Sequence, residues 1–293
     1  MNNRPDCLPC CLRRILHTAD QTTTDEWLHR KILAEAMQEL ARVDDKATPA
    51  DVIHSVAKRT AKTLGLADPY ADEKRQWIGE TTGNAEWITS IVDSAADPFV
   101  AALRLSIAAN ILDSELREDL APGLSLKRLV EGYDKVPFVD ENVEDFRQAV
   151  ADAKKILFVH DAAGELFFDK LLIEKMEKPR DAILSTVREA PILADATRED
   201  AKATGLDSIA TIIDPGIDCL GVPLNACSQS FREHYRSADI IIAKGQGAFE
   251  TLEGKDAQLD GEEKPIFFLL RVKCALLARH LGASVGDCVL EVG

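Results

Sequence analysis

The sequence predicts an α/β protein in which an N-terminal helical region packs on a three-layer α/β/α, Rossmann-like domain with a mostly parallel sheet. Two observations lead to this fold class. Apolar residues in the first half recur at helical spacing, and short β-rich runs alternate with helical patterns after about residue 150. Such alternation is typical of parallel sheets covered by helices. We therefore expect a helical region over 1–150 and an α/β domain over 151–293.

The first half contains the expected helices. Over 26–43, apolar residues fall mostly three or four positions apart, which indicates an amphipathic helix. Thr48 and Pro49 resemble an N-cap followed by proline at the first helical position, and the helix they open is expected to end near Gly65. The segment 97–111 is more continuously apolar, so we expect it to lie deep in the structure.

The second half contains the expected sheet. Strands are predicted over 155–160, 182–187, 209–214, 238–243, 265–270 and 288–292, with helices over 165–177, 197–204, 223–235 and 249–252. Thr197 and Asp200 have the spacing of a capping box with Asp in place of Glu. The acidic stretch 253–263 is expected to be a solvated surface loop.

Composition limits the classes of partner. Asp and Glu number 50 against 35 Lys and Arg, giving a formal charge of −15, which argues against a nucleic-acid-binding protein. A local site on an acidic protein can still be positive, so a phosphorylated ligand remains possible. No apolar run is long enough to span a membrane, and no signal-peptide core is present. The seven cysteines are then expected to be reduced thiols of a cytoplasmic protein.

Two carboxylates follow predicted strands or apolar runs. Asp161 comes directly after the strand 155–160, and Asp195 follows an apolar run just before a helix. In an open α/β sheet, ligands bind beyond the carboxyl ends of the strands. Two carboxylates with water and phosphate oxygens could complete a six-coordinate site for Mg²⁺ or Mn²⁺. The alternative is that each Asp only caps the next helix, which is the more common arrangement for Asp195.

A third segment has the features of an anion site. Lys244 ends a predicted buried strand, and Gly245 and Gly247 flank the turn that opens the next helix. Backbone N–H groups at such a turn can bind phosphate beside a fixed positive charge, although this pattern alone also fits an ordinary turn. Cys7 and Cys10 have C-x-x-C spacing, which fits a metal site, a redox site or ordinary thiols.

Taken together in this order, the motifs resemble a known family. They are Cys-Leu-Pro-Cys at 7–10, Asp-Ala-Ala-Gly-Glu at 161–165, Asp-Ala-Thr at 195–197, Lys-Gly-Gln-Gly-Ala-Phe-Glu-Thr-Leu at 244–252 and the segment 267–274. They are similar to the domain-of-unknown-function 89 family of metal-dependent damage-control phosphatases, in its prokaryotic branch with an N-terminal C-x-x-C. The resemblance covers nearly the whole chain.

The resemblance implies hydrolysis of phosphate monoesters of sugar phosphates or of damaged, side-product phosphometabolites. It implies a divalent metal, Mn²⁺, Mg²⁺, Co²⁺ or Ni²⁺, with Asp161 and Asp195 as ligands and a small phosphorylated metabolite as the partner. Asp161 is expected to be catalytic, and Glu165 to position water or substrate. The residues expected to bind substrate or phosphate, or to line the pocket, are Lys244, Gly245, Gly247, Glu250, Asn110 and Asp113.

This chain departs from the family pattern at three positions. Ala162, Ala194 and Ala248 stand where the family motifs have Asn. An amide side chain offers a carbonyl oxygen to a metal and an NH₂ group to phosphate, whereas alanine offers neither. The sequence therefore supports three hypotheses: a metal-dependent phosphatase, a catalytically impaired protein that binds phosphometabolites, or a metal- or redox-handling module built on Cys7 and Cys10. The physiological substrate and the oligomeric state cannot be predicted from it.

Overall fold

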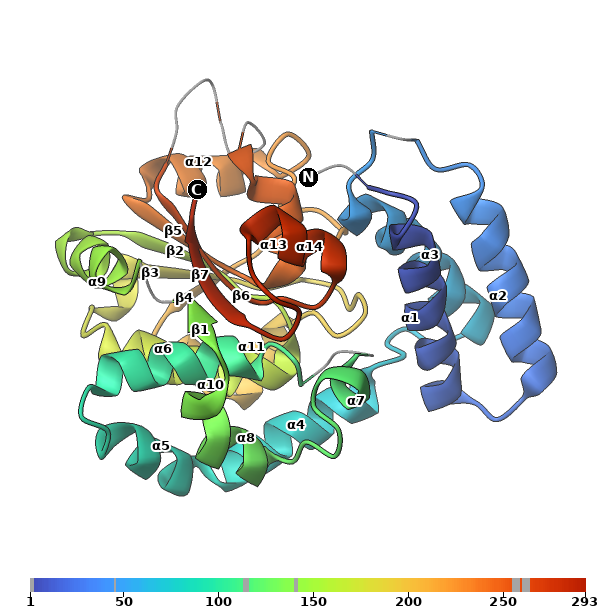
Figure 1. Ribbon diagram of the computed structural model, residues 1–293. Helices are drawn as coiled ribbons and strands as arrows, with labels where there is room; N and C mark the ends of the chain where they lie inside the picture. The colour runs from blue at the N-terminus through green and yellow to red at the C-terminus, as the bar shows by residue number, and fades with distance from the viewer. Residues whose placement is uncertain (1–2, 45, 113–115, 140–141, 255–258, 260–263) are drawn as a thin grey trace.

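The computed structural model describes residues 3–44, 46–112, 116–139, 142–254, 259 and 264–293. A mixed sheet lies between helices in this part of the chain (Figure 1). The strands are β1 (Phe138–Val139), β2 (Ile156–Val159), β3 (Ile183–Thr186), β4 (Thr211–Ile213), β5 (Ile240–Lys244), β6 (Ile266–Arg271) and β7 (Cys288–Val292).

The α-helices that precede β2 are α1 (Cys7–Thr22), α2 (Glu26–Leu40), α3 (Pro49–Leu64), α4 (Ala71–Gly83), α5 (Ala85–Asp93), α6 (Pro98–Ala109), α7 (Arg117–Leu120), α8 (Leu126–Gly132) and α9 (Val143–Asp152). Those that follow it are α10 (Leu166–Lys175), α11 (Arg198–Ala203), α12 (Gln229–Ser237), α13 (Gly245–Leu252) and α14 (Ala275–Leu281). Short 3₁₀ turns are η1 (Tyr133–Lys135), η2 (Ala163–Glu165), η3 (Arg180–Ala182) and η4 (Leu206–Ser208).

The order of the strands creates a topological switch point at the carboxyl edge of the sheet. The order is β1-β7-β6-β5-β2-β3-β4, and every neighbouring pair is parallel except β6 and β7. From β2 the chain builds outward through β3 and β4, and it then returns to the other side of β2 to form β5 and β6. The direction of winding therefore reverses between β2 and β5, where α/β proteins bind their ligands.

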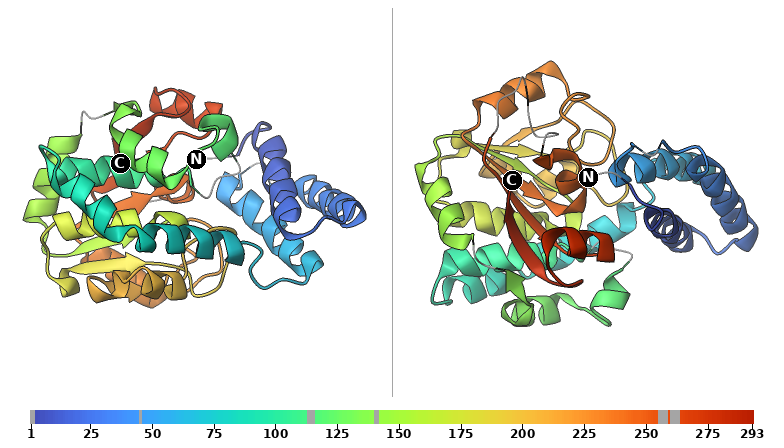
Figure 2. Two further views of the ribbon diagram at one scale, coloured as in Figure 1. Left: turned by 90° about the horizontal axis from the view of Figure 1, so that it is seen from below. Right: turned by 45° about the horizontal axis from the view of Figure 1, so that its top comes forward.

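Helices cover both faces of the sheet, so its central strands are buried along their whole length. Every residue of β2, β3, β5 and β6 is buried, as expected for parallel strands enclosed by helices. Phe158 of β2 belongs to a core shared with α6 and α10, whereas Phe268 of β6 belongs to a core shared with α12, α13 and α14. Figure 2 shows the helices on the two faces of the sheet from two further directions.

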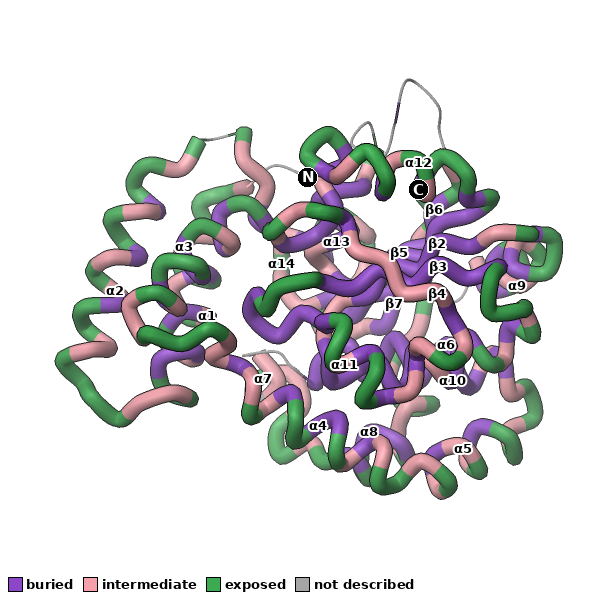
Figure 3. The backbone as a smooth tube through the Cα atoms, turned by 180° about the vertical axis from the view of Figure 1, so that it is seen from behind, coloured by how far each residue is buried: buried purple, intermediate pink, exposed green. Residues whose placement is uncertain are grey.

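Helices α1, α2 and α3 form a separate unit beside the sheet (Figure 1). Their apolar faces meet in a core that includes Ile15, Ile32 and Val56, and this core continues onto Leu193 and Leu220 near the carboxyl edge of the sheet. Along α1, α2 and α3, exposed residues alternate with buried and intermediate ones, as expected of amphipathic helices (Figure 3). The unit joins the rest of the chain through 65–70.

The structure confirms the α/β fold class and the local signals behind it. Thr48 forms a capping box with Asp51, and Thr197 forms one with Asp200. Each of the six predicted strands is present within two residues of its expected bounds. The sequence pattern did not indicate β1, because a strand of two residues is too short to show a periodicity.

Three predictions are not confirmed as they were stated. Helix α12 begins at Gln229 rather than 223, because Ser228 supplies its N-cap by accepting a hydrogen bond from the N–H of Phe231. The acidic stretch 253–263 lies largely outside the described residues. The division at residue 150 stays a prediction, since helices from before that point pack on the sheet with α10. Within the described chain, no helix is long and apolar enough to cross a membrane.

Candidate active site

A cavity of about 330 Å³ opens at the carboxyl edge of the sheet. The loop after β2 contributes Asp161 and Ala162, and the loop before α11 contributes Ala194 and Asp195. Helices α1, α3 and α13 and the start of α14 form the remaining walls. The cavity therefore lies between the helical unit α1–α3 and the switch point of the sheet, where the winding order predicts a ligand.

Asp161 is held from three sides. Its Oδ2 accepts a hydrogen bond from Asn110 Nδ2 at 2.9 Å, and its main-chain oxygen accepts one from the N–H of Ala196 at 2.8 Å. Gly245 lies against the carboxylate with a φ of 77°, and a Cβ there would come within 1.8 Å of Asp161 Oδ2. Only glycine gives this backbone its left-handed conformation without strain and leaves space for the carboxylate.

Asp195 lies beside Asp161 because Ala162 and Asp195 form an antiparallel β-bridge. Its Oδ2 accepts a hydrogen bond from Arg188 Nε at 2.9 Å, and both side chains are largely buried. Burial raises the pKa of Asp195 to about 6, the positive charge of Arg188 opposes this shift, and the negative charge of Asp161 adds to it. The two carboxylates thus share a region of excess negative charge.

The residues present fit a divalent cation held partly by water. Neither Asp161 Oδ1 nor Asp195 Oδ1 has a hydrogen-bond partner among the described residues. Carboxylate oxygens suit Mg²⁺ or Mn²⁺, and Mg²⁺ is often held by one or two carboxylates together with waters and substrate phosphates. No group of three or more His, Cys, Asp or Glu side chains in the described chain is arranged to hold a metal. The arrangement therefore fits an open, hydrated site rather than a closed protein cage.

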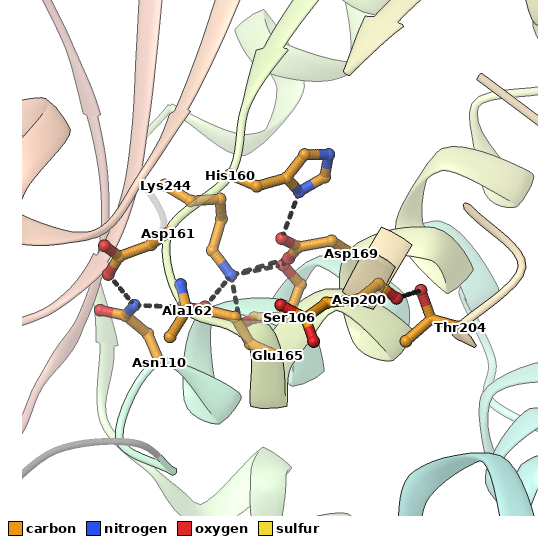
Figure 4. A network of polar contacts seen from close by, with 10 residues as sticks. All are labelled: Ser106, Asn110, His160, Asp161, Ala162, Glu165, Asp169, Asp200, Thr204 and Lys244. Atoms are coloured by element: carbon orange, nitrogen blue, oxygen red, sulfur yellow. Dashed lines mark hydrogen bonds and ion pairs between the residues drawn. The ribbon is translucent and has the colours of Figure 1, made fainter. Parts of the chain in front are cut away.

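Behind Asp161, a buried network joins α6, the loop after β2, α10 and the end of β5 (Figure 4). Lys244 Nζ donates hydrogen bonds to Glu165 Oε2 at 2.5 Å, to Asp169 Oδ1 at 2.8 Å and to the main-chain oxygen of Ser106 at 2.8 Å. Asn110 Nδ2 donates to Glu165 Oε1 at 2.8 Å as well as to Asp161. One amide group therefore connects the network to the carboxylate at the cavity.

The charges in this network depend on one another. Burial lowers the pKa of Lys244, but the adjacent carboxylates of Asp169 and Glu165 outweigh it, so the net shift is upward and the amine stays charged. Burial raises the pKa of Glu165 to about 7 against the effect of Lys244. For Asp169, burial acts upward, yet Lys244 and His160 hold its pKa below the ordinary value. Lys244 is thus the cation that keeps two buried carboxyl groups in place.

His160 extends the network away from the cavity. Its Nδ1 lies 2.8 Å from Asp169 Oδ2, so the ring nitrogen donates to the carboxylate. Its Nε2 is buried and has no hydrogen-bond partner among the described residues. The ring also stacks on Phe158 with centroids 4.4 Å apart. These contacts fix the backbone immediately before Asp161.

Cationic and thiol side chains line the other walls of the cavity. Lys273, at the turn between β6 and α14, faces the cavity with Arg14 of α1 and Arg279 of α14. Lys273 has no hydrogen bond or ion pair with another described residue, so its charge is available to a ligand. Cys7, Cys10, Cys11 and Cys274 line the same cavity.

Comparison with known proteins adds to this geometry. Residues 4–289 match the damage-control phosphatase ARMT1-like domain. The chain belongs to this family. It is 30% identical to a damage-control phosphatase of Archaeoglobus fulgidus, over 100% of this chain and 99% of that protein, and 32% identical to one of Pyrococcus horikoshii, over 97% and 96%.

A solved structure agrees with the assignment. The crystal structure of a domain-of-unknown-function 89 family protein from Pyrococcus horikoshii superposes with a TM-score of 0.80 at 30% identity, covering 99% of this chain and 98% of that one. An uncharacterised protein of Methanocaldococcus jannaschii is 32% identical over 98% of this chain and 94% of its own length. The names of the relatives support a phosphatase role for the ARMT1-like family.

The structure of this ARMT1-like chain brings together some of the predicted site residues. Asp161, Asp195, Gly247 and Glu250 line the cavity. Gly245 lies beneath Asp161 rather than on the wall, where it makes space for the carboxylate.

Other predicted site residues do not line the cavity. Lys244 and Glu165 are fully buried, and they bind each other rather than facing the cavity. Direct contact of Lys244 with phosphate, or of Glu165 with water or substrate, would require this network to open. Asn110 is also buried and does not line the cavity; it holds Asp161 and Glu165 instead. Asp113 lies outside the described residues.

Only two of the three alanines that replace Asn of the family motifs line the cavity. Ala162 and Ala194 line the cavity, so an amide at either position would face the ligand. Ala248 is buried in the core on the α13 side of the sheet and is not a cavity residue. The loss of polar groups at the site is therefore limited to Ala162 and Ala194.

Sequence reasoning missed Arg188, Asp169 and Lys273. Asp169 lies four residues after Glu165, a spacing that places both carboxyl groups on one helical face and could have indicated a shared cation. Arg188 follows the predicted strand 182–187, but nothing in the sequence pairs it with Asp195. Lys273 follows the strand 265–270 at the same edge of the sheet, and that position was a usable signal.

Proposed function

We propose that this protein is a divalent-metal-dependent phosphatase that hydrolyses phosphate monoesters of small metabolites, such as sugar phosphates or damaged phosphometabolites. The observation that supports it is that Asp161 and Asp195 lie side by side at one cavity, each with an oxygen that has no hydrogen-bond partner in the described chain. Bound there, Mn²⁺, Mg²⁺, Co²⁺ or Ni²⁺ supplies positive charge that stabilises a transferring phosphoryl group.

The residues of this chain have separate roles in the proposal. Asp161 and Asp195 would hold the metal, and Asn110 and Arg188 fix their carboxylates through the hydrogen bonds described above. Lys273 would bind the phosphate from the facing wall. Positioning of this kind accounts for most of phosphoryl-transfer catalysis, because the protein has little covalent chemistry to perform.

A screen of sugar phosphates with each of the four metals tests this proposal. Multi-turnover phosphate release that needs metal supports it, and the Asp195→Asn variant should lose that release while keeping its fold. Lys273→Ala should raise the inhibition constant for inorganic phosphate about 10- to 100-fold, the size of a charged hydrogen bond. Lys127→Ala, at an exposed lysine far from the cavity, is the matched control.

A second function is supported by the two alanines on the cavity wall. Ala162 and Ala194 remove amide groups from the side of the cavity where metal and phosphate would meet. A protein that binds phosphometabolites without turning them over would retain Lys273 and the carboxylates. Such a protein would bind phosphate in calorimetry and release none from any ester, with or without metal.

A further inference from the structure

Helix α4 lies behind both loops that carry the proposed metal ligands. It packs against η2, which follows Asp161 in the chain, and against α11, which follows Asp195. It begins where the segment 65–70 ends, and the hydroxyl of Tyr70 at its N-cap position lies 2.9 Å from Thr18 Oγ1 of α1. One helix therefore contacts the helical unit α1–α3 and the elements next to both ligands.

Lys74 is a buried cation on α4, and the proposed hydrolysis does not use it. Only 2% of the residue is exposed. Its Nζ donates a hydrogen bond to Asp68 Oδ2 at 3.1 Å and lies 4.0 Å from Asp200 Oδ2. The side chains of Asp68 and Asp200 are only 19% and 15% exposed. Because salt and water screen such charges weakly, this lysine holds together carboxylates from two different segments.

Each of these carboxylates organises the backbone of its own segment. Asp68 Oδ1 accepts a hydrogen bond from the N–H of Tyr70 at 2.9 Å, at the start of α4. Asp200 Oδ2 accepts hydrogen bonds from the N–H of Thr197 at 2.9 Å and from its hydroxyl at 2.6 Å, within the capping box that begins α11. The carboxylate that faces Lys74 is therefore bonded to the backbone that directly follows the Asp195 loop.

The loop that carries Asp195 has a strained backbone. Leu193 has a φ of 45°, in the left-handed region that residues other than glycine rarely adopt. A strained conformation of this kind persists only where the surrounding structure holds it in place. The N–H of Ala196 is bonded to the main-chain oxygen of Asp161, and the Asp200 cap holds the residues that follow. The position of Asp195 thus depends on contacts made by its neighbours.

We propose that Lys74 is a positioning residue for Asp195: it holds the Asp200 carboxylate in place, and through the capping box it fixes the loop that presents Asp195 to the metal. The inference rests on the proposed function, in which Asp195 is a metal ligand. Lys74 does not line the cavity, so it acts through Asp200 rather than by touching metal or substrate.

The test compares Lys74→Met with two control variants of the full-length protein. Arg75→Met removes an exposed cation from the next position of the same helix. Ile88→Ala opens a gap in the buried core away from the cavity, so it lowers stability without touching the site. Each folded variant is titrated with Mn²⁺ by calorimetry, and hydrogen exchange is measured at the N–H of Thr197.

Lys74→Met should weaken Mn²⁺ affinity about 10- to 100-fold, the usual cost of removing a group that orients a metal ligand. It should also speed hydrogen exchange at the N–H of Thr197 about tenfold, because the Asp200 carboxylate loses the cation that holds it. Arg75→Met should change each quantity by less than about twofold. Ile88→Ala should lower the urea midpoint and leave Mn²⁺ affinity unchanged, which a purely structural role of Lys74 would also predict for Lys74→Met.

A double variant shows whether Lys74 acts through Asp200. Asp200→Asn keeps an oxygen that can accept the N–H of Thr197, but it removes the charge that faces Lys74. Adding Lys74→Met to Asp200→Asn should therefore weaken Mn²⁺ binding by less than about twofold further. If the two losses in affinity instead add in full, Lys74 does not act through Asp200 and the proposal is refuted.

Asp195→Asn separates this inference from the proposed function. If Asp195→Asn loses Mn²⁺ affinity while Lys74→Met keeps it, the positioning role fails and the metal site stands. If Asp195→Asn binds Mn²⁺ as tightly as the unmodified protein, the proposed metal site fails. Hydrogen exchange at Thr197 in Lys74→Met then still decides whether Lys74 holds the loop, and an unchanged rate overturns that role.

Discussion

Replacing Gly245 by alanine tests whether the position of the Asp161 carboxylate determines the rate of phosphate release independently of the stability of the fold. The new Cβ would lie 1.8 Å from Asp161 Oδ2 and 2.2 Å from its Cγ, so the carboxylate must move by more than an ångström to restore normal contact. A misplacement of about 1 Å can cost about 100-fold in rate, so we expect metal-dependent phosphate release to fall by about that factor. The left-handed backbone adds about 1–2 kcal/mol of strain.

Gly282→Ala is the matched control for this experiment. Gly282 has a φ of 65°, close to the 77° of Gly245, but no atom lies within 4 Å of its ideal Cβ position. Gly245→Ala should lose at least as much free energy of unfolding in urea as Gly282→Ala, because it adds the contact with Asp161 to the same backbone strain, and only Gly245→Ala should lose activity. Equal kcat values in the two variants, measured at saturating metal and substrate, would show that the position of Asp161 does not limit the reaction.

Three further predictions follow from the charges at the site. Lys244→Met should lower the free energy of unfolding in urea by about 3–5 kcal/mol, because it leaves buried carboxyl groups without their cation. The control Lys127→Met, at an exposed lysine, should change it by less than about 1 kcal/mol. Equal losses in the two variants would contradict a structural role for the network. Burial raises the pKa of Asp195 to about 6, so protonation removes this ligand at low pH. Calorimetry should show that Mn²⁺ affinity falls about tenfold per pH unit below pH 6 and levels off above about pH 7. An affinity that stays constant from pH 5 to 7.5 would show that Asp195 is not a ligand. Ala162→Asn should tighten Mn²⁺ binding and raise turnover by adding an oxygen ligand beside Asp161; if neither rises in a folded variant, the binding-protein hypothesis gains support.

The fold could be predicted from local patterns wherever those patterns were long. Strands such as β5 and β6 are continuous apolar runs between turns, and α3 carries both its cap and its proline in the sequence. The antiparallel direction of β7 could not be predicted, because it depends on the path of the chain between β6 and β7 rather than on residues within the strand.

The candidate site was predictable only in part, for a similar reason. Asp161 and Asp195 were identified because strand ends converge in a parallel sheet. The contacts of Lys244 could not be predicted, because a lysine after a buried strand can face either a ligand or buried carboxylates. The choice is decided by Glu165 and Asp169, whose side chains come from another element of the fold. Contacts between elements of this kind leave no periodic signal in one sequence.

The buried ion network around Lys244 also has a consequence for how the protein can evolve. Lys244, Glu165 and Asp169 are each fully buried, and each neutralises or is neutralised by another. Loss of Lys244 alone leaves two buried carboxyl groups without their cation, whereas loss of one carboxyl group leaves Lys244 paired with the other. Across lines of descent, Lys244 is therefore expected to change only together with its two partners or after them, while the exposed residues of α2 drift independently.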